Sequence, residues 1–300
     1  YSILQSYGQT RGSNLFHSFG AFGVPTGQTA DCQGAGIRNI VARVTGGARS
    51  DIDGQIKSSI AGANLFLMNP AGIMFGPNAS LNVSGSFHAT TADYIGFANG
   101  DRFMANPSAA GSTLSIANPA SFGFLGPNSG AITINGSSLS APSLSLAAGS
   151  IDIHQDGVLP GGNFNVIATS GTMNVFTMQS AGTIGLDGTL SGSLGGTVSI
   201  TNLGRVSAES TTGGNVNVVT GSLTLSGDSA SSAQSFISAA NLGAGASTGL
   251  VKLTADSITV DGVGRVTTQT AGTVGVDVLV NTRNLALTNG GQITTEINGS

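Results

Sequence analysis

The sequence predicts an all-β protein that folds as a parallel β-helix, and three observations carry this prediction. The first is composition: 47 of the 300 residues are glycine, whereas only 10 are Lys or Arg and 14 are Asp or Glu. An interior glycine costs a helix about 1 kcal/mol relative to alanine, so this composition opposes long helices. The sequence also lacks a run of about 18 apolar residues, so we expect no helix that spans a bilayer.

The second observation is the alternation of apolar and polar residues in short runs bounded by Gly, Asn, Asp or Ser. A period of two between turn residues is typical of half-buried strands. We therefore expect strands of three to five residues along the chain. The clearest runs are Ile132–Ile134, Leu144–Leu146, Ile151–Ile153, Val198–Ile200, Val216–Val218 and Leu223–Leu225.

The third observation is an internal repeat near the end of the sequence. The segment that begins at Val251 matches the segment that begins at Val278, and the match resumes at Gly264 and Gly291. A fixed period of about 27 residues is typical of stacked architectures. Three short strands per repeat favour a parallel β-helix, with coils stacked about 4.8 Å apart. A β-sandwich is the alternative fold.

Aromatic residues divide the chain into two regions. Ten of the 13 Phe and all three Tyr lie at or before Phe124. We expect residues 1–126 to form a capped N-terminal region with a bulky core, to which Phe16, Phe19 and Phe22 contribute. Residues 127–300 are expected to continue the same structural unit as β-helix coils packed with small aliphatic side chains. The repeat is still in progress at the last residue, so we expect a longer parent chain.

Charge limits the possible partners. No Lys or Arg lies between Ala105 and Gly204, whereas a nucleic-acid surface needs clustered cations. Nucleic-acid binding is therefore excluded. The single cysteine, Cys32, allows no intrachain disulfide.

Two acidic clusters raise the possibility of a carbohydrate-active β-helix enzyme. Asp51 lies two residues before Asp53, and Asp152 is followed by His154 and Asp156. Such enzymes need carboxylates that converge from adjacent coils to bind calcium or to act as acid and base. A corner turn explains the first pair, and the alternation places the second cluster on an outer face. We expect no catalytic residue, metal ligand or cofactor.

Three blocks of the N-terminal region carry a family resemblance. They read NLFHSFGAFGVPTGQTA from Asn14, IRNIVARVTGGARSDIDGQI from Ile37 and ANLFLMNPAGIMFGPNASLNVSGSFHATTADYIGF from Ala63. In this order they resemble the secretion domain of filamentous haemagglutinin-like exoproteins, the TpsA-type passengers of two-partner secretion (TPS). The family hallmark Asn-Pro-Asn-Gly-Ile occurs here with one departure, because Ala71 replaces the second Asn.

The resemblance implies a right-handed parallel β-helix whose start is capped, and a role as an export address. The expected partner is a TpsB-like outer-membrane transporter of the Omp85 type, whose periplasmic modules engage the extended passenger. Folding outside the cell would leave the protein secreted or on the surface of a Gram-negative-type bacterium, where further regions could bind a host ligand. The alternatives are the carbohydrate-active enzyme and a purely structural adhesin shaft.

The resemblance also supplies candidate residues for partner recognition. In the hallmark we expect a tight turn that holds the cap together, since proline fixes φ and glycine tolerates a positive φ. The second candidate block, Asn14–Phe16, lies at the start of the first of the three matching blocks. The candidate residues are Asn69, Pro70, Gly72, Ile73, Asn14, Leu15 and Phe16.

Overall fold

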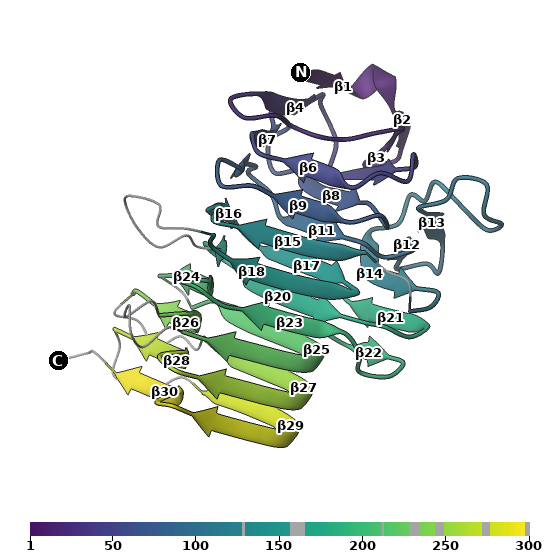
Figure 1. The fold of residues 1–300 in the computed structure, drawn as a ribbon. Coiled ribbons are helices and arrows are strands. Elements are labelled where there is room, and N and C mark those ends of the chain that lie inside the picture. The colour runs from purple at the N-terminus through teal and green to yellow at the C-terminus, as the bar shows by residue number, and fades with distance from the viewer. Residues whose placement is uncertain are drawn as a thin grey trace.

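The protein is a three-faced parallel β-helix with a small antiparallel sheet on one flank (Figure 1). The structure is a computed structural model, and it describes residues 1–127, 130–156, 166–211, 213–227, 234–243, 249–271 and 277–297. From the N-terminal end to the C-terminal end, each coil lies on the one before it, so the chain advances along the long axis of the molecule.

Each coil contributes strands to three faces, which we call the first, second and third face. The first face contains β3 (Asn14–Phe19), β5 (Asn39–Val44), β8 (Asn64–Met68), β11 (Phe87–Thr90), β17 (Leu144–Ala148), β20 (Thr172–Thr177), and the first halves of β25 (Asn215–Ser226), β27 (Val251–Asp261) and β29 (Val278–Thr288). The second face contains β6 (Ser50–Ile52), β9 (Ile73–Phe75), β15 (Ala131–Asn135), β18 (Ser150–His154), β23 (Thr197–Ile200), and the second halves of β25, β27 and β29.

The third face consists of two sheets in succession. The first sheet contains β1 (Ser2–Leu4), β4 (Thr29–Gln33), β7 (Gln55–Ser58) and β10 (Ser80–Asn82). The second contains β16 (Leu139–Ala141), β19 (Val166–Ala168), β24 (Arg205–Ser210), β26 (Phe236–Asn241), β28 (Arg265–Thr270) and β30 (Gln292–Ile297). All pairs within the three faces are parallel, apart from β2 (Gln9–Arg11), which pairs antiparallel with β3. A short 3-10 helix, η1 (Gln5–Tyr7), joins β1 to β2 at the N-terminal end of the stack.

The register of the coils confirms the predicted repeat. Val251 of β27 pairs with Val278 of β29, and Arg265 of β28 pairs with Gln292 of β30, so both pairs keep the predicted spacing. The interior is filled by ladders in which each coil adds one apolar side chain above the last. On the first face one ladder runs through Leu15, Ile40, Leu65, Phe87, Leu144, Met173, Val216 and Val251, all buried. Burying each such side chain contributes about 1.5–3 kcal/mol.

The predicted strand length of three to five residues is wrong for several strands. β3 and β5 have six residues, and β25 has 12. The long strand bends around a corner of the helix, so that Asn215–Val219 pairs with β20 on the first face and Ser222–Leu225 pairs with β23 on the second. Gly221 lies at the bend, where its N–H donates to the carbonyl of Gly195. The corner therefore does not interrupt the ladder of hydrogen bonds.

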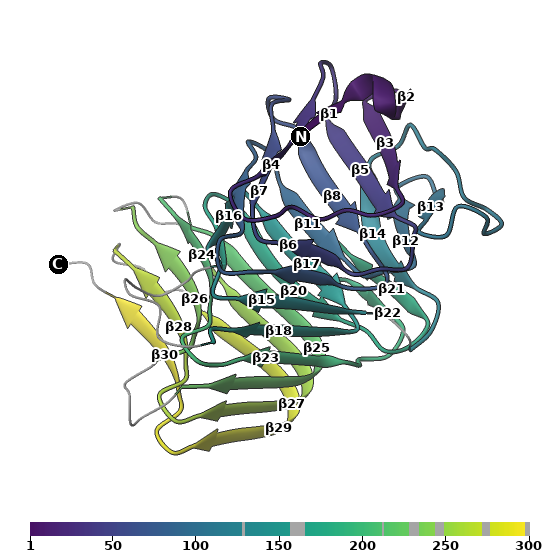
Figure 2. The ribbon, with the colours of Figure 1, turned by 45° about the horizontal axis from the view of Figure 1, so that its top comes forward.

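The small sheet on the flank, which we call the lateral sheet, is built from two excursions of the chain. It contains β12 (Tyr94–Phe97), β13 (Arg102–Met104), β14 (Pro119–Phe124), β21 (Gly182–Gly185) and β22 (Leu190–Ser191), all antiparallel. One excursion leaves the coil after β11 and the other after β20. Because both leave at the corner between the first and second faces, they meet at the β14–β21 pair (Figure 2).

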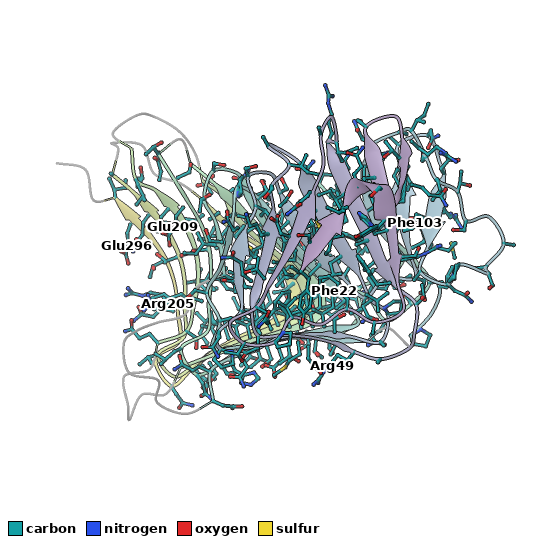
Figure 3. All side chains as sticks on the ribbon, turned by 90° about the horizontal axis from the view of Figure 1, so that it is seen from above. Phe22, Arg49, Phe103, Arg205, Glu209 and Glu296 are labelled. Carbon is teal, nitrogen blue, oxygen red and sulfur yellow. The ribbon has the colours of Figure 1, made fainter. Side chains whose placement is uncertain are left out.

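A second core lies between the lateral sheet and the outer side of the first face. Its largest buried members are Phe16, Phe66, Phe97, Phe103, Phe122, Phe124, Phe176, Met68 and Met178. The N-terminal aromatic residues were expected in a capped core, whereas most of them lie on this flank. Phe103 marks the flank in Figure 3, whereas Phe22, together with Phe19, packs against the aliphatic interior.

Candidate functional site

The hallmark motif forms a tight turn at the corner between the first and second faces. β8 ends at Met68 and β9 begins at Ile73. The Gly72 N–H donates to the carbonyl of Asn69 (3.0 Å), which closes a four-residue turn with Pro70 in its second position. This is the position that the fixed φ of proline favours. The predicted turn is therefore present.

The Asn69 side chain fastens this corner to the preceding coil. Its Nδ2 donates to the Ala48 carbonyl (3.0 Å) and to Ser50 Oγ (2.9 Å), and its Oδ1 accepts from the Ala71 N–H (3.0 Å). Asn69 is 1% exposed. A buried amide left without partners would cost about 1–3 kcal/mol, so these contacts account for an asparagine at this position.

The remaining residues of the motif divide between the interior and the surface. Ile73 is fully buried in the aliphatic core. Gly72 has φ +112°, and a Cβ atom added to it would lie 3.1 Å from the Ala131 carbonyl oxygen. A side chain at residue 72 is therefore strained both by conformation and by contact. Ala71, the departure from the family hallmark, is exposed. In the folded protein this departure removes no buried contact.

The motif also forms one wall of a groove of about 310 Å³. Asn69, Pro70 and Ala71 line it on one side, and Ala105–Pro107, just after β13 of the lateral sheet, line it on the other. The hallmark turn thus lies next to the start of the segment that connects β13 to β14.

The second candidate block begins with an amide ladder. Asn14 is fully buried, and its Nδ2 donates to the carbonyls of Ser115 (2.9 Å) and Ala117 (2.6 Å). Asn39 Nδ2 donates to Asn14 Oδ1 (2.8 Å), and Asn64 Nδ2 donates to Asn39 Oδ1 (3.0 Å). The three side chains therefore connect three successive coils to the segment before β14.

The next two residues of the block face opposite sides of the first face. Leu15 is fully buried in the aliphatic interior, whereas Phe16 points outward into the second core. The Phe16 ring centroid lies 5.0 Å from that of Phe103 and 6.0 Å from that of Phe97. Phe16 therefore anchors the lateral sheet.

The structure does not bring the two candidate blocks together. Asn14 begins β3 and Asn69 follows the end of β8, so they lie at opposite ends of the first face. They share a neighbour, however, because Asn14 binds the end of the segment between β13 and β14, and Asn69 lines a groove with its start. Asn39 and Asn64 were not among the predicted site residues, although all three amides precede an apolar run at the same spacing along the chain.

The two acidic clusters lie apart on the outside of the helix. Asp53 accepts hydrogen bonds from Thr26 Oγ1 and from the Asn78 N–H (2.9 Å) and Nδ2 (3.0 Å). Burial raises the pKa of Asp53, but these hydrogen bonds lower it by more than burial raises it, so the pKa lies below its ordinary value. Asp51 instead pairs with Arg49, at 2.7 Å between Oδ1 and Nε.

In the second cluster, His154 lies between two carboxylates on the outer side of β18. Its Nδ1 is 3.1 Å from Asp152 Oδ2, and its Nε2 is 3.7 Å from Asp156 Oδ1. The predicted outward orientation of Asp152 and His154 is present, since Ile151 and Ile153 fill the interior. Within the described ranges, no group of three or more His, Cys, Asp or Glu is arranged to hold a metal ion. Within the described part of the chain, no helix has the length and the apolar character that are needed to cross a membrane.

Comparison with known proteins gives one matching family and several similar solved structures. The family model described as TPS secretion domain matches residues 1–207. The crystal structure of the HMW1 secretion domain from Haemophilus influenzae is similar, with a TM-score of 0.50 and 14% identity over 96% of this chain and 80% of that one. A crystal structure of a filamentous hemagglutinin secretion domain is similar with a TM-score of 0.40 and 15% identity over 95% and 90% of the two chains. No curated protein matches.

Proposed function

The chain belongs to the TPS secretion domain family, and from this premise we propose that it is the export address of a TpsA-type exoprotein. The partner is a TpsB-like outer-membrane transporter of the Omp85 type, whose periplasmic modules bind the chain before it folds. The product is released from a Gram-negative-type bacterium or stays at its surface. The observation that carries the proposal is the family match over residues 1–207, together with the hallmark at Asn69–Ile73.

Burial of the candidate residues supports recognition of the unfolded chain. Asn14, Leu15, Asn69 and Ile73 are all at most 1% exposed in the folded protein. Side chains buried to this extent are accessible to a partner only before folding. Extended segments of this sequence could then add to a sheet edge of the periplasmic modules, which is a general mode of peptide recognition.

After transit, the same residues take up a structural role. Asn69 fastens one coil to the preceding coil, and Asn14 joins the first coils to the segment before β14. Each completed coil presents a sheet edge on which the next coil can pair, so folding can follow the order of emergence. We propose that residues 1–126 hold the recognition elements and that residues 127–300 extend the stack. No catalytic role is proposed, because the two acidic clusters lie apart on the outside of the helix and do not form the paired carboxylates of a glycosidase.

The direct test is secretion of this chain, placed behind a signal peptide, in a Gram-negative host with and without the candidate transporter. We expect release into the medium only when the transporter is present. Equal release in both strains would overturn the proposal.

The role of the hallmark is tested in the same assay with Asn69→Ala and, as a matched control, Asn82→Ala, an exposed residue of β10. We expect reduced release for Asn69→Ala alone. Refolding of both purified variants from urea separates the two contributions. If Asn69→Ala refolds normally yet is retained in the periplasm, the residue acts in recognition; if both refolding and release fail, it acts through the fold.

A further inference from the structure

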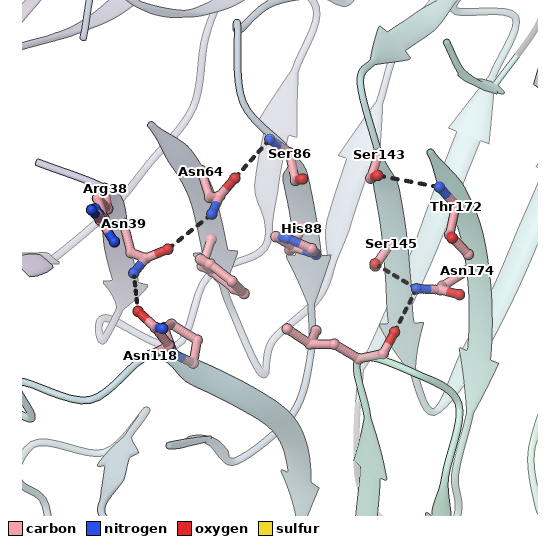
Figure 4. A pocket seen from close by; sticks show the side chains of 13 residues that line it. Arg38, Asn39, Asn64, Ser86, His88, Asn118, Ser143, Ser145, Thr172 and Asn174 are labelled. Carbon is pink, nitrogen blue, oxygen red and sulfur yellow. Dashed lines mark hydrogen bonds between the residues drawn. The ribbon is translucent and has the colours of Figure 1, made fainter. Parts of the chain in front are cut away.

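A polar groove between the first face and the lateral sheet has no role in the proposed export function. It has a volume of about 490 Å³, within the range of about 300–1,000 Å³ that small-molecule sites occupy. Its floor is the outer surface of β8, β11, β17 and β20, and its rim includes Pro119 of β14 and Leu186, which follows β21. Figure 4 shows His88 at the centre of this floor.

The polar side chains of the floor come from one row across the sheet. His88 pairs in register with Phe66 on one side and with Ser145 on the other, and Ser145 pairs with Asn174. Outward residues in a row stand about 4.8 Å from their neighbours. The row therefore presents a ring nitrogen, a hydroxyl and an amide at regular intervals.

Two buried polar atoms in this row have no hydrogen-bond partner among the described residues. Asn174 Nδ2 uses both of its hydrogens, on Ser145 Oγ (3.2 Å) and on the Leu186 carbonyl (2.9 Å), so its unpartnered Oδ1 remains to accept. His88 Nδ1 is likewise buried and unpartnered, and His88 is 7% exposed. Buried polar atoms are nearly always satisfied, so each unsatisfied atom indicates a missing partner.

The His88 ring is held in place and is neutral. It stacks on Phe66, with 4.1 Å between ring centroids and 16° between the planes. Burial lowers the pKa of His88 to about 3, so at neutral pH one ring nitrogen carries a proton and the other accepts. A hydroxyl group can complement either nitrogen, because it both donates and accepts.

Charge and shape narrow the class of ligand. Among the described residues that line the groove, Arg38 is the charged one and none is a carboxylate. The groove offers no negative charge to a bound cation, and it offers a bound anion the Arg38 guanidinium alone. Neutral oxygen and nitrogen groups on the floor, facing apolar side chains of Pro119 and Leu186 on the rim, complement a molecule with hydroxyls on its edge and C–H groups on its face.

We propose that this groove binds a neutral sugar, as a monosaccharide or disaccharide unit, one hydroxyl of which hydrogen-bonds to His88 Nδ1 while another donates to Asn174 Oδ1. Ser145 lies between these two atoms on β17 and orients the Asn174 amide. The lateral sheet is part of the site, because the Leu186 carbonyl accepts from the Asn174 amide and the residue closes one side.

The test is a titration of the 300-residue chain with glucose, galactose, mannose, N-acetylglucosamine, lactose and maltose at millimolar concentrations, followed by backbone amide NMR. We expect at least one sugar to give saturable shifts at His88, Ser145 and Asn174. If no sugar of the panel does so, water alone satisfies the two atoms and the proposal is overturned. Shifts confined to other regions would overturn it as well.

Two variants and one matched control make the assignment specific. His88→Phe keeps an aromatic ring against Phe66 but removes the ring nitrogens, and we expect Kd to rise about fivefold, the factor for one neutral hydrogen bond. Leu186→Trp fills the groove from the rim without altering the aliphatic interior, and it should abolish the shifts in a variant whose far-ultraviolet circular dichroism spectrum remains native. His17→Phe changes another buried histidine with an unpartnered nitrogen outside the groove, and it should leave Kd unchanged. Binding that survives both His88→Phe and Leu186→Trp would refute the site.

Discussion

Single buried amides connect neighbouring coils in this protein. The side-chain amide of Asn69 hydrogen-bonds through both its nitrogen and its oxygen, to the preceding coil and to its own turn. The side-chain amide of Asn14 does the same, to the next coil and to the segment before β14. A backbone ladder alone allows coils to slip in register, whereas a buried amide is satisfied in one register. At this scale the candidate recognition residues also specify the fold.

The first prediction concerns Asn69→Ala. The substitution leaves the Ala48 carbonyl and Ser50 Oγ without their buried donor, so we expect the free energy of unfolding to fall by about 1–3 kcal/mol. Urea denaturation measures the change. The exposed neighbour provides the control, because Ala71→Asn should change stability by less than about 0.5 kcal/mol. Similar effects at both positions would contradict the role given to the Asn69 contacts.

The second prediction concerns the pH dependence of stability. The ordinary pKa of histidine is 6.5, and burial lowers the pKa of His88 to about 3. Between these values the unfolded state binds the proton and the folded state does not. His88 therefore stabilises the fold fully above pH 6.5. This contribution is lost as pH falls, by up to about 1.4 kcal/mol per pH unit.

Urea denaturation from neutral pH to about pH 5 measures this slope. His88→Phe should flatten the profile, although His17, whose pKa burial also lowers, leaves a residual slope. Asp31 and Asp53 act at lower pH: burial raises their pKa values, but hydrogen bonds outweigh burial and bring them below 3.8. An unchanged slope in His88→Phe would show that this residue does not titrate as described.

At the scale of elements, the lateral sheet depends on close contact between strands. Gly123 of β14 pairs with Tyr94 of β12, and the Tyr94 ring lies over the glycine. A Cβ atom at residue 123 would lie 2.0 Å from the ring atom Cζ, whereas the backbone there is unstrained. Arg102 of β13 lies over the same ring, 4.6 Å from its centroid. Because residue 123 has no side chain, β12, β13 and β14 can all contact the Tyr94 ring.

The third prediction is that Gly123→Ala loosens the lateral sheet and spares the helix. The ring must move to admit the methyl group, so amide hydrogen exchange should accelerate in β12, β14 and β21 and stay unchanged in β28. Gly126→Ala is the matched control, because nothing lies within 4 Å of its Cβ position. In a Tyr94→Ala background, Gly123→Ala should lower the free energy of unfolding by less than it does in the native chain. An equal loss in both backgrounds would show that the methyl group does not clash with the Tyr94 ring.

At the scale of the whole molecule, the stack and its flank form one unit. Contacts along the axis join each coil to its neighbours, which makes stability close to a sum over coil interfaces. The lateral sheet adds a connection of another kind, because β14 and β21 come from different coils and cover the same second core. Residues on both sides of position 126 therefore share one core.

The fourth prediction follows from this connection. A fragment of residues 1–126 lacks β21 and the buried side chains of Phe176, Met178 and Ile184 that complete the second core. Since each such side chain contributes about 1.5–3 kcal/mol, we expect it to unfold at a markedly lower urea concentration than a fragment of residues 1–211. Far-ultraviolet circular dichroism monitors both transitions. Coincident midpoints would mean that the second core is complete without β21.

Much of the architecture and part of the candidate site could be predicted from local patterns. The alternation, the corner residues and the match between the segments at Val251 and Val278 specify a stacked β fold, because strand period and coil repeat are properties of neighbouring residues. The turn at Asn69–Gly72 was equally predictable, since proline and glycine impose it locally. The partners of the Asn69 side chain were not, because most of them belong to the preceding coil.

Local sequence patterns were enough to predict the class of fold, the repeat, the family and the residues of the hallmark turn. Three features became visible only in the folded protein: the second core that the aromatic residues build on the flank, the continuation of β25 around a corner, and the groove that His88 and Asn174 line. The physical reason in each case is a contact between coils, such as the hydrogen bond from the Gly221 N–H to the Gly195 carbonyl at the corner of β25. The excursions after β11 and after β20 are far apart in the sequence, yet they meet because the helix returns the chain to the same corner, and no local pattern encodes that meeting.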